Sequence, residues 1–399
     1  MTAASTTMPP RAYHGPALLR NGFRPFFLAA GLWSVLAMVL WLAMLTGRID
    51  LPTAFDPLTW HIHEMLFGFV AAAVAGFLLT AIPNWTGRLP VRGAPLAALA
   101  LIWLAGRFAV GLSAWTGPVA AAVVDVAFLC LLGAVALREV VAGGNWRNLP
   151  VTAVIGVFAV ANLLMHLEAI ALGDLDGAGP RLAIATVAFL ITLIGGRVVP
   201  SFTRNWLAKR GEARLPGAFG PLDKATLVAT ALTGLAWTAV PDHPAVGAMA
   251  LLAALLHALR LARWRGLRTG AEPLVLVLHL GYVWLPVGFG LIGLAIFFPA
   301  LGSSAALHAL TAGAMGTMIL AVMTRATLGH LGRPLTADSM TSLIYLTVLL
   351  AAATRVFGPL VEGGGHAAFS ISGMLWIMAF ALFVVRFGPM LLGCRLQAG

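Results

Sequence analysis

Residues 26–46 read FFLAAGLWSVLAMVLWLAMLT, an apolar segment without a single charged side chain. About 20 apolar residues in a helix span the hydrocarbon core of a bilayer. Every backbone polar group there needs a partner within the protein, and a helix supplies it. The segment is therefore predicted to be a transmembrane helix. Eleven similar segments follow, at residues 60–83, 94–113, 117–142, 150–172, 180–205, 222–241, 244–265, 273–299, 303–330, 338–361 and 367–392.

The composition of the whole chain agrees with this prediction. Of the 399 residues, 60% are hydrophobic and 10% are charged, whereas soluble domains are about half apolar and a quarter charged. The apolar runs are too long for the strands of a membrane β-barrel. The sequence therefore predicts an all-α polytopic membrane protein with about 12 transmembrane helices, whose main partner is the lipid bilayer.

The formal net charge of +11 comes mostly from arginines in short loops. Basic residues in such loops mark the cytoplasmic side of a membrane protein. In the predicted topology only Arg48 and Arg181 fall in loops on the opposite side. We therefore expect a bacterial inner-membrane protein with both termini cytoplasmic and no nucleic-acid partner. A cytoplasmic tail (residues 1–22) would precede a single transmembrane domain (residues 23–399). Cys130 and Cys394 are too few for a disulfide framework.

Four histidines are predicted to lie at one depth toward the periplasmic face: His61, His63, His166 and His308. Imidazole is a common ligand of copper and of haem iron. Each histidine alone reads as an interfacial or core residue, but four from three helices favour a metal or haem site. Helical geometry turns His61 and His63 about 200° apart. Glu64 could orient the imidazole of His63, and Asn162, four residues before His166, could do the same on its own helix.

Other intramembrane polar residues allow simpler interpretations. Arg107 and Asp125 have matching depths and are predicted to form a structural ion pair. Nearer the cytoplasm lie His257, His279 and His330, and the arginines Arg24, Arg197 and Arg325 could bind haem propionates there. Contact with lipid phosphate is an equally good reading of each arginine. Small-residue grooves at Gly68, Ala72 and Ala75, and at Gly290 and Gly293, could hold a macrocycle or a neighbouring helix.

A weak repeat closes the second, sixth and tenth predicted helices: IPNWT (82–86), VPSFT (199–203) and MTRAT (323–327). Three four-helix units would explain it. This arrangement resembles the catalytic subunit of haem–copper oxidases, in which helices 2 and 10 supply haem histidines. Helix 6 carries no histidine here and helix 7 has no His-His pair, so the copper site of that superfamily is not reproduced.

Longer motifs carry a more specific resemblance. The segments GFRPFF (22–27), WHIHEMLFG (60–68), PNWTGR (83–88), GGRVVP (195–200), FTRN (202–205) and GHLG (329–332), together with His308, closely resemble the NnrS family. The resemblance implies a twelve-helix membrane protein that binds haem and copper and is linked to nitric oxide metabolism and nitrosative-stress defence. The family's histidine motifs map onto His61, His63, His166, His279, His308 and His330.

The leading hypothesis is a haem–copper membrane protein, with b-type haem, that reduces, oxidises or sequesters nitric oxide using an electron donor that the sequence does not identify. His63 or His61 would ligate haem together with His308, and the remaining histidines of that group, including His166, would bind copper. His279 with Arg24, Arg197 and Arg325 is the alternative haem site. The rival functions are a transporter of copper or of a small anion, and a haem-binding sensor or assembly factor.

Overall fold

The computed structural model describes residues 13–171, 177–360 and 365–393, and over these ranges it is helical with no strand. Residues 1–12 of the predicted tail, Cys394 and Arg395 lie outside the described residues. The principal helices are α1 (Phe23–Leu45), α2 (Pro57–His63), α3 (Ala71–Thr86), α4 (Ala94–Gly111), α5 (Ser113–Thr116), α6 (Pro118–Ala142), α7 (Leu149–Ala171), α8 (Ala178–Leu190), α9 (Gly196–Lys209), α10 (Pro221–Ala239), α11 (Pro244–Ala262), α12 (Pro273–Phe297), α13 (Ser304–His308), α14 (Thr317–His330), α15 (Ser339–Phe357) and α16 (Gly365–Leu392).

The helices confirm the predicted all-α membrane fold. Each of the twelve predicted segments corresponds to a helix or a continuous helical run, with ends that differ by at most about four residues. Within the described ranges, eleven of these are long and apolar enough to cross a membrane. The twelfth, α10, carries Thr226, Thr230 and Thr233 and is less apolar, but it packs against α8 and α11. Its polar side chains are therefore buried against protein.

Three continuous helices are among the most buried spans: α2 to α3 (Pro57–Thr86), α8 to α9 (Ala178–Lys209) and α13 to α14 (Ser304–His330). Each contains a π-helical segment: η2 (Glu64–Val70), η4 (Ile191–Gly195) and η7 (Ala309–Gly316). We call these three the central helices. They are the helices that the weak repeat links.

The π segments also have a bearing on function. In α2 and α13 the wider winding begins directly after a histidine, His63 in one helix and His308 in the other. Such segments are rare and occur frequently at functional sites. In the third central helix, the carbonyl of Thr192 lies in η4 and accepts a hydrogen bond from Arg260 Nη1 at 2.8 Å. A side chain from α11 thus satisfies a carbonyl group in the irregular winding.

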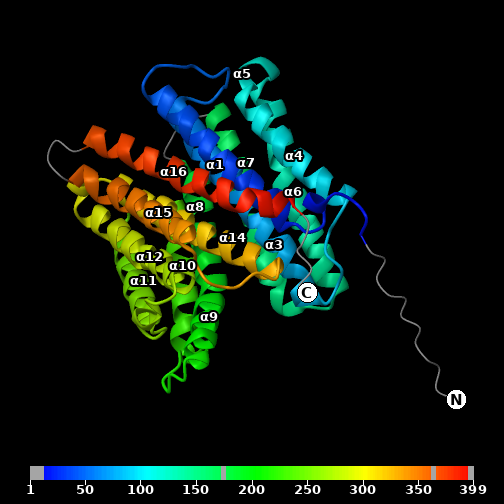
Figure 1. Ribbon diagram of the computed structural model, residues 1–399. Coiled ribbons are helices and arrows are strands. Elements are labelled where there is room, and N and C mark those ends of the chain that lie inside the picture. The colour runs from blue at the N-terminus through cyan, green and yellow to red at the C-terminus, as the bar shows by residue number, and fades with distance from the viewer. Residues whose placement is uncertain (1–12, 172–176, 361–364, 394–399) are drawn as a thin grey trace.

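The first and last helices close the bundle. In Figure 1 the blue α1 lies against the red α16, and the two pack together. Arg24 at the start of α1 donates to the carbonyls of Leu391 at 2.8 Å and Gly393 at 2.5 Å. These carbonyls belong to the end of α16, where the backbone lacks helical partners. Arg24 therefore holds the C-terminal helix in position.

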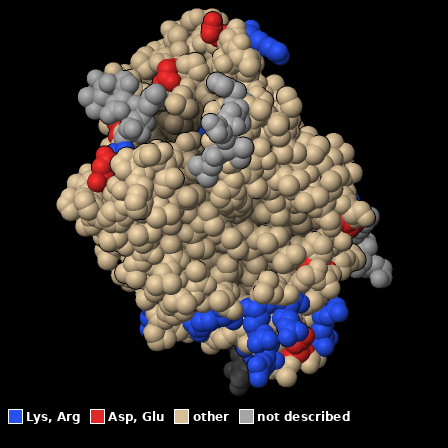
Figure 2. All heavy atoms as spheres, turned by 90° about the vertical axis from the view of Figure 1, so that its left-hand side faces the viewer, with Lys and Arg blue, Asp and Glu red and all other residues tan. Residues whose placement is uncertain are grey.

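Basic residues are concentrated at one end of the bundle. Figure 2 shows lysines and arginines gathered in a band at one end of the bundle. We call this the basic end; the three central helices end there, and Arg88, Lys209, Arg210 and Arg333 lie at or just after their last residues. His61, His63, His166 and His308 lie toward the opposite end, because α2 and α13 begin there and α7 ends there. We call this the histidine end.

The close packing of α7 and α8 provides a test of the fold. A Cβ added to Gly179 would lie 2.5 Å from the backbone nitrogen of Met165 and 2.8 Å from its Cα. Because backbone must move to relieve this contact, Gly179→Ala should lower the free energy of unfolding by about 1–3 kcal/mol. The matched control is Gly156→Ala in α7, which meets nothing within 4 Å. Thermal unfolding in detergent should separate the two variants, and equal melting temperatures would contradict the packing.

Candidate metal centre

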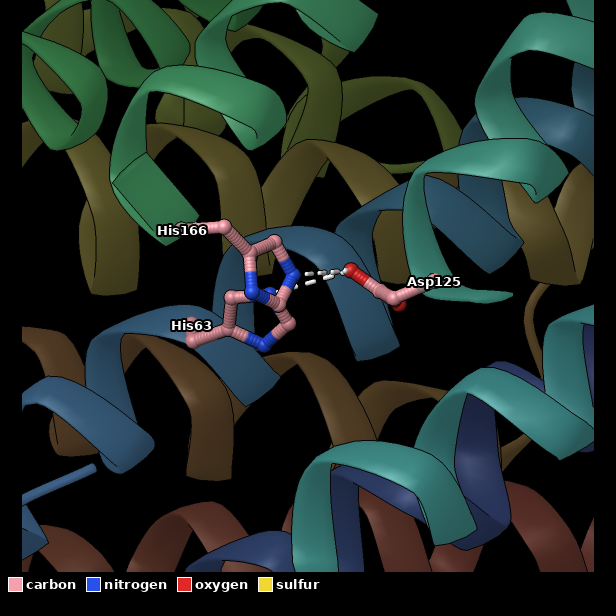
Figure 3. A group of neighbouring side chains, drawn as sticks. All are labelled: His63, Asp125 and His166. Carbon is pink, nitrogen blue, oxygen red and sulfur yellow. Dashed lines mark hydrogen bonds and ion pairs between the residues drawn. The ribbon is translucent and has the colours of Figure 1, made fainter. Parts of the chain in front are cut away.

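A buried cluster at the histidine end brings together His63 from α2, Asp125 from α6 and His166 from α7 (Figure 3). Nε2 of each imidazole lies 3.1 Å from Oδ2 of Asp125. All three side chains are at most 1% exposed. One nitrogen or oxygen atom from each residue lies within 4.8 Å of the others. This is a set of two nitrogen donors and one oxygen donor from three helices.

Three further side chains surround this cluster. Glu64 Oε1 lies 3.1 Å from His63 Nδ1, and Glu64 Oε2 accepts a hydrogen bond from Arg107 at 2.7 Å. Arg107 also donates to Oδ1 of Asp125, which confirms the predicted ion pair. Asn162 donates to Oδ2 of Asp125 at 2.8 Å, and its own oxygen lies 3.1 Å from His63 Nε2. Glu64 therefore contacts His63 as predicted, and Asn162, which was expected to orient His166 on its own helix, contacts His63 as well.

The charged side chains of the cluster carry more negative than positive charge. Glu64 and Asp125 carry two negative charges and Arg107 carries one positive charge, so with neutral imidazoles the buried group has a net charge of −1. An uncompensated charge is expensive inside a membrane protein. A bound metal cation or a proton on an imidazole would supply the missing charge. The imidazole and carboxylate donors are ligands that divalent copper accepts.

Aromatic packing covers the cluster. The ring of Phe55 lies 5.3 Å from the ring of His63 and 5.4 Å from that of His166. Phe55 belongs to the segment between α1 and α2, which Ser113 anchors by accepting a hydrogen bond from the backbone N–H of Ala54 at 2.8 Å. Phe55 is 8% exposed and separates the imidazoles from solvent.

His61 points to a different environment, as the helical geometry predicts. Its ring stacks on Trp41 at 4.5 Å, and its Nδ1 is buried without a hydrogen-bond partner. It lies in the neighbourhood of His308 and Arg355. His308 Nδ1 donates to the carbonyl of Ser304 at 2.8 Å, which leaves Nε2 of the neutral ring as an acceptor. Arg355 donates to the hydroxyl of Ser304 at 3.1 Å.

The four histidines thus form two pairs rather than one group. His63 and His166 share a carboxylate and an environment with net negative charge. His61 and His308 lie beside Arg355, which makes no ion pair with a carboxylate in the described part of the chain. A free cation is favoured at the first pair and disfavoured at the second.

The residues predicted nearer the cytoplasm are dispersed. His279 Nε2 bonds Thr203 Oγ1 at 2.7 Å, and His257 lies between Thr230 and Tyr282 at 3.0 and 2.9 Å. Arg24 binds the end of α16. Arg197, Arg325 and His330 all line a cavity of about 580 Å³.

The small-residue grooves are filled by neighbouring helices. A Cβ at Gly68 would lie 2.4 Å from Trp33 Nε1, and one at Gly293 would lie 2.7 Å from Leu251. Of the two predicted occupants of these grooves, a macrocycle or a neighbouring helix, the structure shows the neighbouring helix. Sequence reasoning placed Arg355 in the periplasmic half of the membrane but did not place it beside His308, and it identified neither Phe55 nor the cavity. The signal that it underused was Asp125, a carboxylate at the same predicted depth as the histidines.

Comparison with known proteins agrees with this architecture. No curated protein matches the sequence. The sequence pattern of the family described as NnrS protein matches residues 17–395, which is nearly the whole chain and includes every residue of both histidine pairs. The chain belongs to the NnrS family of membrane proteins, which is associated with nitric oxide.

Proposed function

We propose that this protein binds copper and a b-type haem in the bacterial inner membrane and handles nitric oxide, by reduction, oxidation or sequestration. The observation that carries the proposal is the division of four histidines into two pairs with opposite electrostatic surroundings. One pair suits a metal cation. The other suits a cofactor that needs axial imidazoles and carries carboxylates of its own.

The residues of the first pair fit copper. His63 Nε2, His166 Nε2 and Asp125 Oδ2 converge and are buried, and a cation would neutralise the net charge of the cluster. Glu64 would orient the ring of His63 through Nδ1, and Asn162 and Arg107 would hold the carboxylate of Asp125. Such outer partners fix the ring orientation and the basicity of metal ligands. Phe55 would exclude water from the site.

His61 and His308 would hold the iron of a haem. His61 has a buried Nδ1 that lacks a partner, and the carbonyl of Ser304 fixes the tautomer of His308 with Nε2 available. Arg355 has a buried Nη1 without a partner and could bind a propionate. A haem bound here would supply an iron that can bind nitric oxide and exchange electrons. The protein's own contribution is to orient the two rings and to supply the positive charge.

The distribution of charge supports an orientation. Because basic residues mark the cytoplasmic side, the basic end in Figure 2 would face the cytoplasm and the histidine end the periplasm. Both termini would then be cytoplasmic, and both histidine pairs would lie in the periplasmic half of the membrane.

The test is reduced-minus-oxidised absorbance of the purified protein together with iron and copper analysis. We expect His61→Ala and His308→Ala to lose the Soret band and keep copper. His166→Ala should lose copper and keep the Soret band, and His14→Ala at an exposed position should change neither. A His308→Ala variant with an unchanged haem spectrum would show the axial assignment to be wrong.

The rival functions give different results. A transporter should move copper or a small anion into liposomes and show neither iron nor a Soret band. A sensor or assembly factor should show the band but no consumption of nitric oxide when a reductant is supplied. A nitric-oxide-metabolising protein should consume the gas at a rate that depends on both histidine pairs.

A further inference from the structure

A cavity of about 580 Å³ lies between the three central helices and is used by neither histidine pair. Its volume is typical of a site for a small organic molecule. The walls come from all three central helices, with Val151 and Ile155 of α7 and Leu335 of the segment after α14. The cavity therefore lies inside the bundle, between segments far apart in the sequence.

The cavity has an apolar end and a polar end. Toward the middle of the bundle its lining consists of residues such as Val70, Val187 and Leu190. Toward the basic end it is lined by Asn84, Arg197, Arg325 and His330. Among the residues that the structure describes, no carboxylate lines the cavity, so the polar end offers mainly hydrogen-bond donors. A ligand with a long apolar part and acceptor oxygens at one end would match both ends.

The two arginines are held in position without an ion pair. The guanidinium of Arg325 lies over the ring of Phe202 at 3.8 Å, and Arg197 donates to Asn148 Oδ1 at 3.4 Å. Neither forms an ion pair with a carboxylate within the described ranges. An arginine in such a setting keeps donors available for an oxygen that carries negative charge.

Aromatic side chains give the cavity flat walls. Phe27, Phe77, Trp85 and Phe202 all line it. Flat rings pack well against aromatic side chains, so these residues favour a planar ring over a flexible acyl chain. Together with the donors at the polar end, they favour a planar ring with two oxygens.

We propose that this cavity binds an isoprenoid quinone or quinol. The ring oxygens would bind Arg197, Arg325 and Asn84, and the isoprenoid part would occupy the apolar end. The guanidinium groups would donate hydrogen bonds to the partly negative ring oxygens.

The experiment uses the full-length protein in detergent and decylubiquinone as the probe. Trp85 lines the cavity, so a bound quinone should quench part of the tryptophan emission in a saturable manner, and Trp85→Phe should remove that part. Arg197→Met with Arg325→Met should weaken the affinity at least tenfold, whereas Arg268→Met at an exposed position should leave it unchanged. Ala326→Phe, which fills the cavity, serves as a second variant should the double substitution not fold.

Each result is decisive. Saturable quenching that the cavity variants weaken, with an unchanged Soret band, supports a quinol site. Quenching that is absent, or equal in Arg268→Met and the cavity variants, overturns the proposal. Loss of the Soret band in the cavity variants would assign the cavity to haem. Co-purified acidic phospholipid that the variants release would assign it to lipid. Tryptophan quenching does not require a bound metal, so the quinone result can be interpreted even if the protein binds neither haem nor copper.

Discussion

Asp125→Asn should reduce the copper affinity of the purified protein by about 100-fold or more. The substitution keeps the size of the side chain but removes the charged oxygen that lies 3.1 Å from both imidazoles. It also brings the net charge of the buried group from −1 to zero, so a cation is no longer favoured there. Metal analysis after dialysis against a copper buffer measures the change.

Two variants bracket this result. Glu64→Gln also brings the net charge to zero and removes the ion pair with Arg107, but it leaves all three ligand atoms in place, so a smaller loss of about 10–100-fold is expected. His14→Ala, in an exposed loop, should have no effect. If Asp125→Asn still retained one copper per chain at the affinity of the unaltered protein, the cluster would be a structural network and copper would bind elsewhere.

The helices could be predicted from the sequence because lipid imposes a simple rule. A bilayer demands about twenty apolar residues per span, and charged or proline-rich breaks mark the ends. α10 shows where this rule weakens. Thr230 bonds the backbone carbonyl of Thr226 at 2.7 Å and contacts His257 at 3.0 Å. A helix can thus be less apolar when its polar atoms find partners within the protein.

The site was less predictable because it depends on side-chain direction. The 100° step per residue separates His61 from His63, and the structure confirms that they face different neighbours. The identity of those neighbours depends on the rotation of α6, α7 and α15 about their axes, which low amphipathicity leaves undetermined. Arg355 illustrates this: nothing in its local sequence indicates a position beside His308. The cavity is even less predictable from the sequence, because it forms where the side chains of three helices do not fill the space between them.

The strongest stability effect is expected at Arg107. This side chain is 3% exposed and joins Glu64 to Asp125. Arg107→Met would leave two buried carboxylates without a cation, and removing one partner of a buried ion pair typically costs about 3–5 kcal/mol. The melting temperature of the metal-free protein in detergent should therefore fall by several degrees. Arg48→Met, at an exposed loop position, should change the free energy of unfolding by no more than about 0.5 kcal/mol.

A second substitution separates charge from packing. Glu64→Gln added to Arg107→Met restores the net charge of the cluster to −1 while the guanidinium remains absent. If the missing charge causes the instability, the double variant should recover part of the lost melting temperature. If lost packing of the long side chain causes it, the double variant should be no more stable than Arg107→Met. Copper should then stabilise the single variant more than the unaltered protein, because a cation at His63 and His166 would replace the charge that Arg107 supplied.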